Sequence, residues 1–291
     1  MIYIIIPVHN RLNLTKKCIE SLCLQSYNEW VLFLVDDGST DNTEKYINEL
    51  KNNKINYIKG DGSLWWTGAI KLGIDYALKE ASEKDYIMTV NNDIVFEKKT
   101  ITNLIENIDD NLICSSISLD DKESEYAMSS GSKVLSWTLN ITKHPFYGIK
   151  YKNFHNYENV ELDMLTGRSV LYPAKIFMDG NNFDNINFPH YGGDSEFSSR
   201  AKKNGYKLIL VPRSKVFVSR ESTGLNPLDK KLSFKDSLQS LFSIKSTSNL
   251  KTKIKFSLKV PPWYAKPTYM LISILKVFIL LIIGNFFVNK K

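Results

Sequence analysis

The sequence predicts an α/β protein with a mainly parallel central sheet flanked by helices. Three observations predict this architecture. Apolar runs alternate with segments of helical spacing over residues 1–90, polar clusters with carboxylates follow the apolar runs, and the C-terminus turns basic and apolar. We therefore divide the 291 residues into an α/β domain at 1–228 and a helical, membrane-directed extension at 229–291.

Four short apolar runs are predicted as strands: Ile2–Ile6, Trp30–Val35, Ile55–Ile58 and Tyr86–Val90. The segments between them are predicted as helices: Leu12–Gln25, Thr43–Leu50 and Trp66–Lys79. Asp41, followed three residues later by Glu44, is typical of an N-cap before the second of these helices. Right-handed crossovers would place all four strand ends at one edge of the sheet.

Later segments have other patterns. Residues 113–149 alternate over short stretches, which is typical of antiparallel strands or long loops. A polar cluster at His190–Glu196 precedes a predicted helix at Phe197–Lys203, and strands are predicted at Leu208–Val211 and Val216–Val218.

The polar clusters after the first four strands are Pro7–Asn10, Asp36–Ser39, Gly60–Gly62 and Asn91–Asp93. Ligands bind at this edge of open α/β sheets. The carboxylate of Asp93 suits a hard cation held against phosphates. The alternative for each cluster is a plain turn, because Asn, Asp and Gly are ordinary turn residues.

The net charge of +7 is unevenly distributed. Residues 229–291 hold twelve lysines and two aspartates, a net charge of +10, so residues 1–228 carry −3. A slightly acidic body argues against nucleic-acid binding, whereas the basic extension is expected to meet an anionic membrane surface.

The segment Tyr269–Val288 is almost entirely apolar and twenty residues long. That length just spans a bilayer, but Lys276 would lie well inside it at a cost of about 3 kcal/mol. We favour a helix lying in the membrane interface, with a membrane span and a soluble docking helix as alternatives. The apolar run at the N-terminus lacks a basic leader and is too short for a signal peptide.

The three cysteines, Cys18, Cys23 and Cys114, form no CxxC motif and no even framework. This usage predicts a reducing compartment, with the cysteines acting as small buried hydrophobic residues.

These clusters suit a reaction in which a hydroxyl attacks a sugar carbon that carries a nucleoside diphosphate. Asp194 would be the base for the hydroxyl, and a divalent cation on Asp93 would neutralise the departing phosphates. Asp36 or Asp37 would accept a hydrogen bond from a pyrimidine or a ribose. Alternatively, Asp194 is a first-turn carboxylate of a helix, whose N–H groups would lower its pKa.

Other side chains have two interpretations. Trp65 and Trp66 are either core residues or site residues. Arg168 and Arg220 would grip phosphates or form surface ion pairs. None of the four histidines has zinc-ligand spacing, and only His190, four residues before Asp194, is a functional candidate.

The combination resembles an inverting glycosyltransferase of family 2, which has the GT-A (Rossmann-like) fold. The matching stretches are Ile5–Arg11, Val35–Asp41, Asn91–Asp93 in place of a DxD motif, and Gly193–Arg200 in place of EDxDLxxR. The stretch Gly60–Gly68 is similar to one in bacterial enzymes near the rhamnosyltransferases of surface-polysaccharide assembly.

The resemblance implies a nucleotide-sugar donor, UDP- or dTDP-linked, and a glycan or polyprenyl-linked acceptor. The implied donor-binding residues are Pro7, Asn10, Asp36, Asp37, Trp65, Trp66, Gly68, Asn91 and Asn92. Asp93 would hold Mg²⁺ or Mn²⁺, and Asp194 would be the catalytic base. Candidate acceptor or phosphate contacts are Arg168, His190, Glu196 and Arg220.

Two departures from the family pattern affect the site. Asn91 and Asn92 replace carboxylates, so metal affinity would depend on Asp93 and on the diphosphate itself. Gly193 replaces the Glu of the usual Glu-Asp pair, which leaves Asp194 as the base. The sequence also lacks a Gln-x-x-Arg-Trp motif, which argues against a processive synthase.

The resemblance places the protein at the cytoplasmic face of the plasma membrane, where the basic extension would hold it near its acceptor. Two other functions remain open. A nucleotidyltransferase would need a Gly-rich basic loop after the first strand, where this chain has Pro7–Arg11. A catalytically silent, membrane-bound sugar-binding scaffold is the other.

Overall fold

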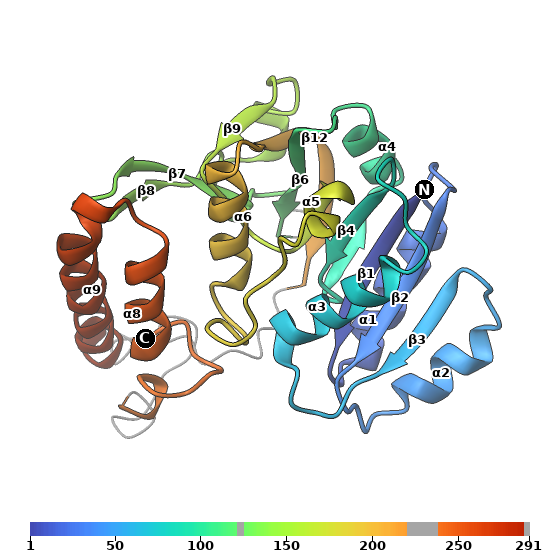
Figure 1. Cartoon of the computed structure of the whole chain (residues 1–291), viewed down its shortest axis with the longest axis horizontal. Helices are drawn as coiled ribbons and strands as arrows, with labels where there is room; N and C mark the ends of the chain where they lie inside the picture. Colours follow the sequence, from blue (N-terminus) through green and yellow to red (C-terminus); the bar gives the residue numbers. More distant parts are fainter. Residues whose placement is uncertain (121–124, 220–237, 288–291) are drawn as a thin grey trace.

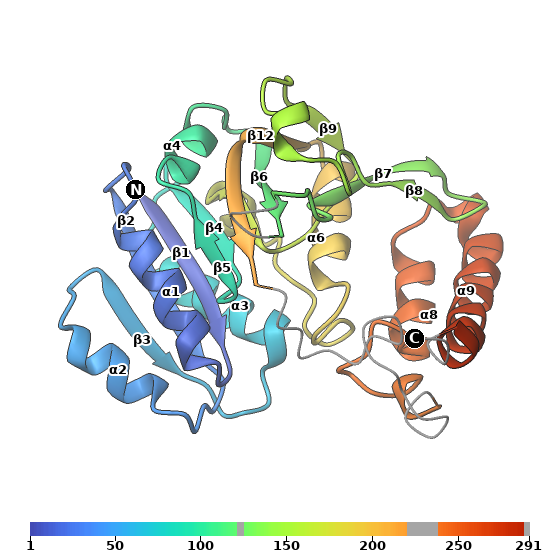
Figure 2. The ribbon, with the colours of Figure 1, turned by 180° about the vertical axis from the view of Figure 1, so that it is seen from behind.

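A nine-stranded sheet forms the centre of the protein, with helices on both of its faces (Figures 1 and 2). The strand order is β3-β2-β1-β4-β11-β6-β12-β5, and β9 pairs with β12. The structure is a computed structural model that describes residues 1–120, 125–219 and 238–287. The predicted α/β class is confirmed.

The first four strands are parallel neighbours, as predicted. They are β1 (Ile2–Val8), β2 (Trp30–Asp36), β3 (Ile55–Lys59) and β4 (Tyr86–Val90). The helices between them are α1 (Leu12–Cys23), α2 (Thr43–Leu50) and α3 (Trp65–Ala77). Their polar C-terminal ends therefore lie at one edge of the sheet.

The other half of the sheet is mixed. β11 (Ser169–Pro173) runs antiparallel to both β4 and β6 (Leu112–Leu119). β12 (Lys207–Val218) is parallel to β6 and antiparallel to β5 (Ile94–Phe96) and β9 (Val160–Leu162). The two strands predicted at 208–211 and 216–218 are thus one strand, whose pairing shifts between Val211 and Lys215.

Residues 113–149 contain both a strand of the main sheet, β6, and a separate small sheet. β7 (Gly131–Ser136), β8 (Ile141–Lys143) and β10 (Met164–Leu165) form this antiparallel sheet. The remaining helices are α4 (Thr100–Ile105), η1 (Tyr151–Asn153), α5 (Lys175–Met178), α6 (Gly193–Lys203), α8 (Leu250–Lys259), η2 (Trp263–Ala265) and α9 (Lys266–Phe287).

Two hydrophobic layers hold the helices against the sheet. Alternate residues of β1 face opposite layers: Ile5 packs with Ile70 and Ile74 of α3, and Ile4 packs with Ile19 of α1. Each buried isoleucine contributes about 1.5–3 kcal/mol. Burial on both faces explains why the β1 sequence is continuously apolar.

Helices α8 and α9 pack together beside α6, and the β7–β8 hairpin reaches α9 in both views (Figures 1 and 2). Trp137 contacts Tyr269 with ring centroids 6.0 Å apart, and Asn140 Nδ2 donates to Ser273 Oγ at 2.9 Å. The boundary predicted after residue 228 lies outside the described residues.

Two local predictions are wrong. Cys18 and Cys114 are buried, but Cys23 is exposed, because it follows Cys18 by five positions and lies on another face of α1. Asp41 does not cap α2: its Oδ2 accepts the N–H of Leu12 at 2.7 Å and so caps α1, while Asn42 is the N-cap of α2.

Candidate active site

The ends of β1, β2 and β3 are joined by backbone hydrogen bonds at the predicted edge. Asp37 N donates to Val8 O at 2.8 Å, and Gly60 N donates to Asp36 O at 2.7 Å. These bonds hold the loops after the three strands together, so the side chains of the loops lie close to one another.

The carboxylate of Asp36 is used within the protein. Its Oδ1 accepts the N–H of Ser39 at 2.8 Å, and its Oδ2 accepts the hydroxyl of Tyr57 at 2.9 Å. Burial and the bond to Asp36 raise the pKa of Tyr57. Asp36 thus shapes the turn after β2, where a nucleoside would be held.

The buried carboxylate of Asp37 fixes the loop before α3. Its Oδ1 accepts the N–H groups of Gly62 at 2.8 Å and Leu64 at 3.2 Å. Its Oδ2 accepts the N–H of Trp65 at 2.8 Å. Trp65 has a φ of +56°, a conformation that costs free energy for a non-glycine residue, and this bond holds it there.

Asn10 ties the β1 loop to the β2 loop. Its backbone N–H donates to Ser39 Oγ at 2.7 Å, and its side-chain Oδ1 accepts the N–H of Thr40 at 2.9 Å. Pro7, three residues earlier, is buried inside β1 opposite Val35. Pro7 is therefore a buried residue of the sheet, and Asn10 lies at the partly exposed edge of the site.

Trp66 links α3 to the end of β4. Its indole Nε1 donates to Asn91 Oδ1 at 2.8 Å, and its ring packs edge-on against Phe183. A Cβ on Gly167 would lie 2.4 Å from the Trp66 ring, so only glycine fits there. Gly68, one turn later in α3, faces Leu64 instead.

The side chains of Asn92 and Asp93 have different hydrogen-bond partners. The Asn92 amide is buried and donates to Thr15 Oγ1 of α1 at 3.0 Å. Asp93 Oδ2 accepts a bond from Arg11 at 3.4 Å, whereas its Oδ1 is buried with no hydrogen-bond partner in the described part of the chain. A buried carboxylate oxygen of this kind suits a cation or a ligand donor.

The backbone at residues 167–168 joins the end of β4 to Asp194. Arg168 follows Gly167 just before β11, its backbone oxygen accepts the N–H of Asn91 at 3.1 Å, and its Nη1 donates to Ser129 O at 2.6 Å. Burial lowers the pKa of Arg168, and the charges of both aspartates oppose that shift. The turn at Asn91–Asp93 and the carboxylate of Asp194 therefore both adjoin residues 167–168.

Asp194 lies in the first turn of α6, which begins after Gly192 at a φ of +85°. Its Oδ2 accepts the N–H of Gly167 at 3.0 Å, and its Oδ1 accepts the N–H of Ser195 at 2.8 Å. We expected the helix start to lower the pKa of Asp194. That expectation is wrong: burial raises this pKa, and the two N–H groups and Arg168 offset only part of the increase.

The missing glutamate at position 193 has a steric explanation. A Cβ on Gly193 would lie 2.6 Å from Thr67 Oγ1 and 3.1 Å from Thr67 Cγ2. The start of α3 therefore occupies the space that a side chain at 193 would need.

His190 packs beside Trp65, with ring centroids 5.6 Å apart, and Lys245 Nζ lies 5.9 Å from the centre of the Trp65 ring. Burial and the charge of Lys245 lower the pKa of His190 to about 4. The imidazole is therefore neutral at pH 7, and its Nδ1 is buried without a described hydrogen-bond partner.

Glu196 is used in an internal ion pair. Its two carboxylate oxygens accept Arg200 Nε at 2.8 Å and Nη2 at 2.9 Å, and Arg200 also donates to Asn182 O. Arg220, the last candidate contact, lies outside the described residues.

Several residues of the predicted clusters, or next to them, have a buried polar atom without a hydrogen-bond partner. Among the described residues these atoms include Asp93 Oδ1, Thr67 Oγ1, Thr166 Oγ1 and His190 Nδ1. Thr67, Thr166 and the paired Arg11 were not predicted as site residues, although Thr166 and Arg11 directly flank motif positions. The described residues contain no group of three or more His, Cys, Asp or Glu side chains arranged to hold a metal ion.

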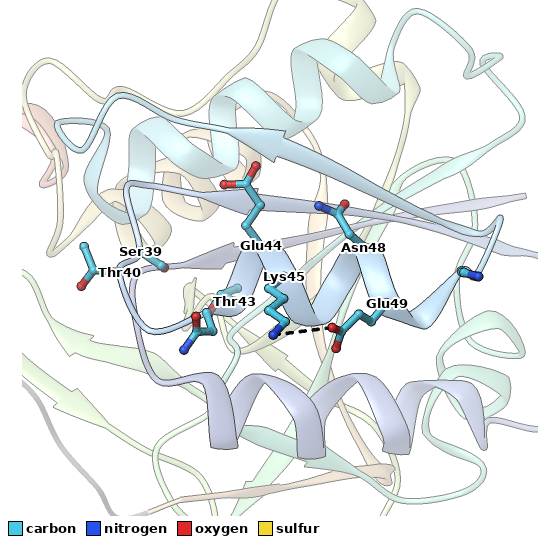
Figure 3. A pocket seen from close by; sticks show the side chains of 9 residues that line it. Ser39, Thr40, Thr43, Glu44, Lys45, Asn48 and Glu49 are labelled. Carbon is cyan, nitrogen blue, oxygen red and sulfur yellow. Dashed lines mark ion pairs between the residues drawn. The ribbon is translucent and has the colours of Figure 1, made fainter.

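An open hollow of about 630 Å³ lies over α2 (Figure 3). Its lining comes from Ser39, Thr40 and the exposed side of α2, including the Lys45–Glu49 ion pair at 3.9 Å. Neither Asp93 nor Asp194 lines it, so the hollow adjoins the loop after β2 and includes neither carboxylate.

A family model described as glycosyl transferase family 2 matches residues 3–178. The chain belongs to this family. The match covers the strands that carry Asp36, Asp37 and Asp93, whereas Asp194 lies after its end.

Two bacterial relatives are similar to parts of this family 2 protein. The glycosyltransferase GlyG of Streptococcus pneumoniae is 26% identical over 37% of this chain and 35% of its own length. An uncharacterized glycosyltransferase of Rickettsia felis is 34% identical over 34% of this chain and 15% of its own length. The matches therefore span only a minor part of these relatives.

Solved structures share the fold at low sequence identity. GalNAc-T7 with UDP, GalNAc and Mn²⁺ has a TM-score of 0.59 at 14% identity, covering 92% of this chain and 53% of that one. The Pyrobaculum calidifontis mannosyltransferase PcManGT, with GDP-Man and Mn²⁺, has a TM-score of 0.56 at 12% identity, covering 100% and 88%. These likenesses confirm the predicted GT-A fold of this family 2 protein.

Proposed function

We propose that this protein is an inverting glycosyltransferase of bacterial surface-polysaccharide biosynthesis. It would move a sugar from a UDP- or dTDP-sugar to a hydroxyl of a glycan or lipid-linked glycan. The observation that carries this proposal is that residues 167–168 bond both to the end of β4 and to Asp194. Arg168 O accepts the N–H of Asn91 at 3.1 Å, and Gly167 N donates to Asp194 Oδ2 at 3.0 Å. The turn that carries Asp93 and the helix start that carries Asp194 therefore meet at one place. One carboxylate then lies beside the leaving diphosphate and the other beside the acceptor.

Asp194 would act as the base. Each of its oxygens accepts one backbone N–H, from Ser195 and Gly167, which fixes the carboxylate and leaves a lone pair for a hydroxyl. Burial raises its pKa, which strengthens the carboxylate as a proton acceptor. The acceptor oxygen, deprotonated as it attacks, displaces the nucleotide from the opposite side of the anomeric carbon.

The donor would lie along the edge formed by β1, β2 and β4. The Asp36 and Asp37 turns shape the nucleoside end, and the loop that Asp37 holds brings Trp65 to the site. Arg11 and Arg168 supply positive charge near Asp93. A bound Mg²⁺ or Mn²⁺ would neutralise charge on the departing diphosphate, with Asp93 Oδ1 as its protein ligand.

Support for this donor class comes from the fold neighbours, of which one was solved with UDP and the other with GDP-Man, both with Mn²⁺. The acceptor and the location follow from the extension. Its lysines and apolar helices favour work at the cytoplasmic face of the plasma membrane on a polyprenyl-linked acceptor.

A donor screen tests the proposal. We expect one UDP- or dTDP-sugar, with Mn²⁺, to raise the melting temperature of the full chain, and Asp93→Asn to remove the metal-dependent part of that increase. Asp75→Asn, an exposed carboxylate on α3, is the matched control. Slow donor hydrolysis without acceptor would separate an enzyme from a silent scaffold. If no nucleotide sugar stabilises the protein or is hydrolysed, the proposal fails.

A further inference from the structure

Helix α9 has two faces of different character. The described residues contain one helix whose length and apolarity suit a membrane span, within the window Trp263–Leu281, and 28% of that window is buried inside the protein. The buried positions recur every four residues: Ala265, Tyr269, Ser273, Val277 and Leu281. This spacing defines a single stripe along the helix.

The buried stripe is attached to the rest of the protein by specific contacts. Val277, only 2% exposed, and Leu281 pack against Leu241. Ser273 accepts a hydrogen bond from Asn140, and Tyr269 contacts Trp137 in the turn between β7 and β8. A helix held along its length by soluble elements cannot also present all of its faces to lipid.

The other face of α9 is apolar and exposed. Leu271, Leu275, Phe278 and Ile279 lie on it, and Leu271 is 59% exposed. Tyr264, at helical spacing from Leu271, extends the same stripe into η2, and Trp263 beside it is 83% exposed. Exposed apolar surface of this extent is typical of an interaction site, and Trp and Tyr prefer the membrane–water boundary.

The charge of the region identifies the partner. Residues 238–287 hold seven lysines and no acidic residue. Lys276, the one charge in the middle of α9, donates to the backbone oxygen of Asn140. Its ammonium therefore points toward the protein, and a spanning helix would have to break this bond and bury the charge in hydrocarbon.

We infer that α9 lies in the plane of an anionic membrane. The face formed by Trp263, Tyr264, Leu271, Leu275, Phe278 and Ile279 enters the headgroup boundary, and Lys251, Lys255 and Lys266 bind anionic headgroups. This inference rests on the membrane location given in the proposed function, and it adds the residues and the orientation. Because binding is measured without substrate, its failure is distinct from failure of the transferase assignment.

Vesicle binding tests the surface. The full chain should co-sediment with phosphatidylcholine vesicles that contain phosphatidylglycerol, and much less with phosphatidylcholine alone. Leu275→Glu combined with Phe278→Glu should lower the partition coefficient about tenfold or more. Leu24→Glu combined with Leu50→Glu, which places the same two charges at exposed leucines of the α/β domain, should leave binding unchanged. Equal binding by the double variant and the wild type would overturn the inference.

Topology tests the orientation. We propose to append a cysteine after Lys291 and to treat sealed vesicles, with the protein added outside, with a membrane-impermeant maleimide. Cys23 is exposed on α1 and reports the side of the α/β domain. An in-plane helix leaves both thiols reactive, whereas protection of the appended thiol alone would show a span and overturn the inference.

Discussion

In the proposed site, the side assigned to the nucleoside and the side assigned to the base, Asp194, differ in how their polar groups are used. On the nucleoside side, the side-chain oxygens already accept hydrogen bonds from neighbouring N–H and O–H groups. The residues concerned are Asp36, Asp37 and Asn10. On the base side, Thr166 Oγ1 and His190 Nδ1 are buried without a described partner. Buried polar groups are normally hydrogen-bonded, so a group left unpaired marks a place for a ligand.

We therefore expect the two sides to have separate roles, with donor binding on the first and the reaction on the second. The nucleoside side is built before a donor arrives, which reduces the ordering that binding requires. The base side keeps its hydrogen-bonding capacity for substrate. Substitutions on the first side should therefore affect folding and donor affinity, and those on the second side should affect turnover.

The largest expected effect is on turnover. Asp194→Asn should lower the transfer rate by about 10²–10⁴-fold, because an amide cannot accept the acceptor proton. Donor affinity should stay near wild type, whereas the melting temperature should fall, because the amide keeps only one of the two oxygens that accept the N–H groups of Gly167 and Ser195. Asp179→Asn on the surface is the control. Transfer at the wild-type rate by Asp194→Asn would remove this residue from its role.

The raised pKa of Asp194 adds a pH dependence. The base works as the carboxylate, so kcat/KM should fall as pH drops through its pKa, at a higher pH than for an ordinary aspartate. A profile of kcat/KM against pH measures this limb. A limb at or below the pH expected for an exposed aspartate would contradict the burial effect.

On the nucleoside side, Asp37→Ala should destabilise the fold by about 3 kcal/mol, roughly 1 kcal/mol for each of the three N–H bonds lost. Urea unfolding measures the change. Asp61→Ala removes a carboxylate from the same loop that bonds only to nearby Ser63, and it should cost much less. Equal losses for the two variants would show that Asp37 does not hold the loop.

Position 193 tests the packing between the two sides. Gly193→Ala should cost about 1–3 kcal/mol, because its Cβ would meet Thr67 at 2.6 Å. Removing both clashing atoms with Thr67→Ala should recover most of that loss in the double variant. If the loss of unfolding free energy in the double variant equals the sum of the losses in the two single variants, this contact is contradicted.

A further expected effect is a change in how stability depends on pH. The pKa of His190 is about 4 in the fold and about 6.5 in an unfolded chain. The unfolded state therefore binds the proton first, and stability should fall as pH drops from 6.5 toward 4. His190→Gln should flatten this part of the profile, whereas His155→Gln in an exposed turn should not. A profile unchanged by His190→Gln would contradict the assignment.

Much of the fold follows from local patterns. Apolar runs such as Tyr86–Val90 and the helical spacing of Thr43–Leu50 depend on neighbouring residues, and both elements have the predicted bounds. The edge that gathers Asp37 and Asp93 followed from the topology of parallel strands. These features need no knowledge of long-range contacts.

The parts that could not be predicted depend on contacts between distant segments. No local pattern indicates that residues 167–168 bond to both Asn91 and Asp194, or that Thr67 excludes a side chain at 193. The pKa of Asp194 had the wrong predicted direction for the same reason. The helix start is visible in the sequence, whereas the burial that outweighs it is a property of the packed structure.

The indole of Trp66 limits how the site can be redesigned. It bonds to Asn91 on one side and covers Gly167 on the other, and the Gly167 amide in turn holds Asp194. A smaller residue at 66 would open a void beneath the base, and a larger one at 167 would displace the ring. Efforts to broaden substrate range should therefore leave this aromatic–glycine pair unchanged and vary the rim around Trp65.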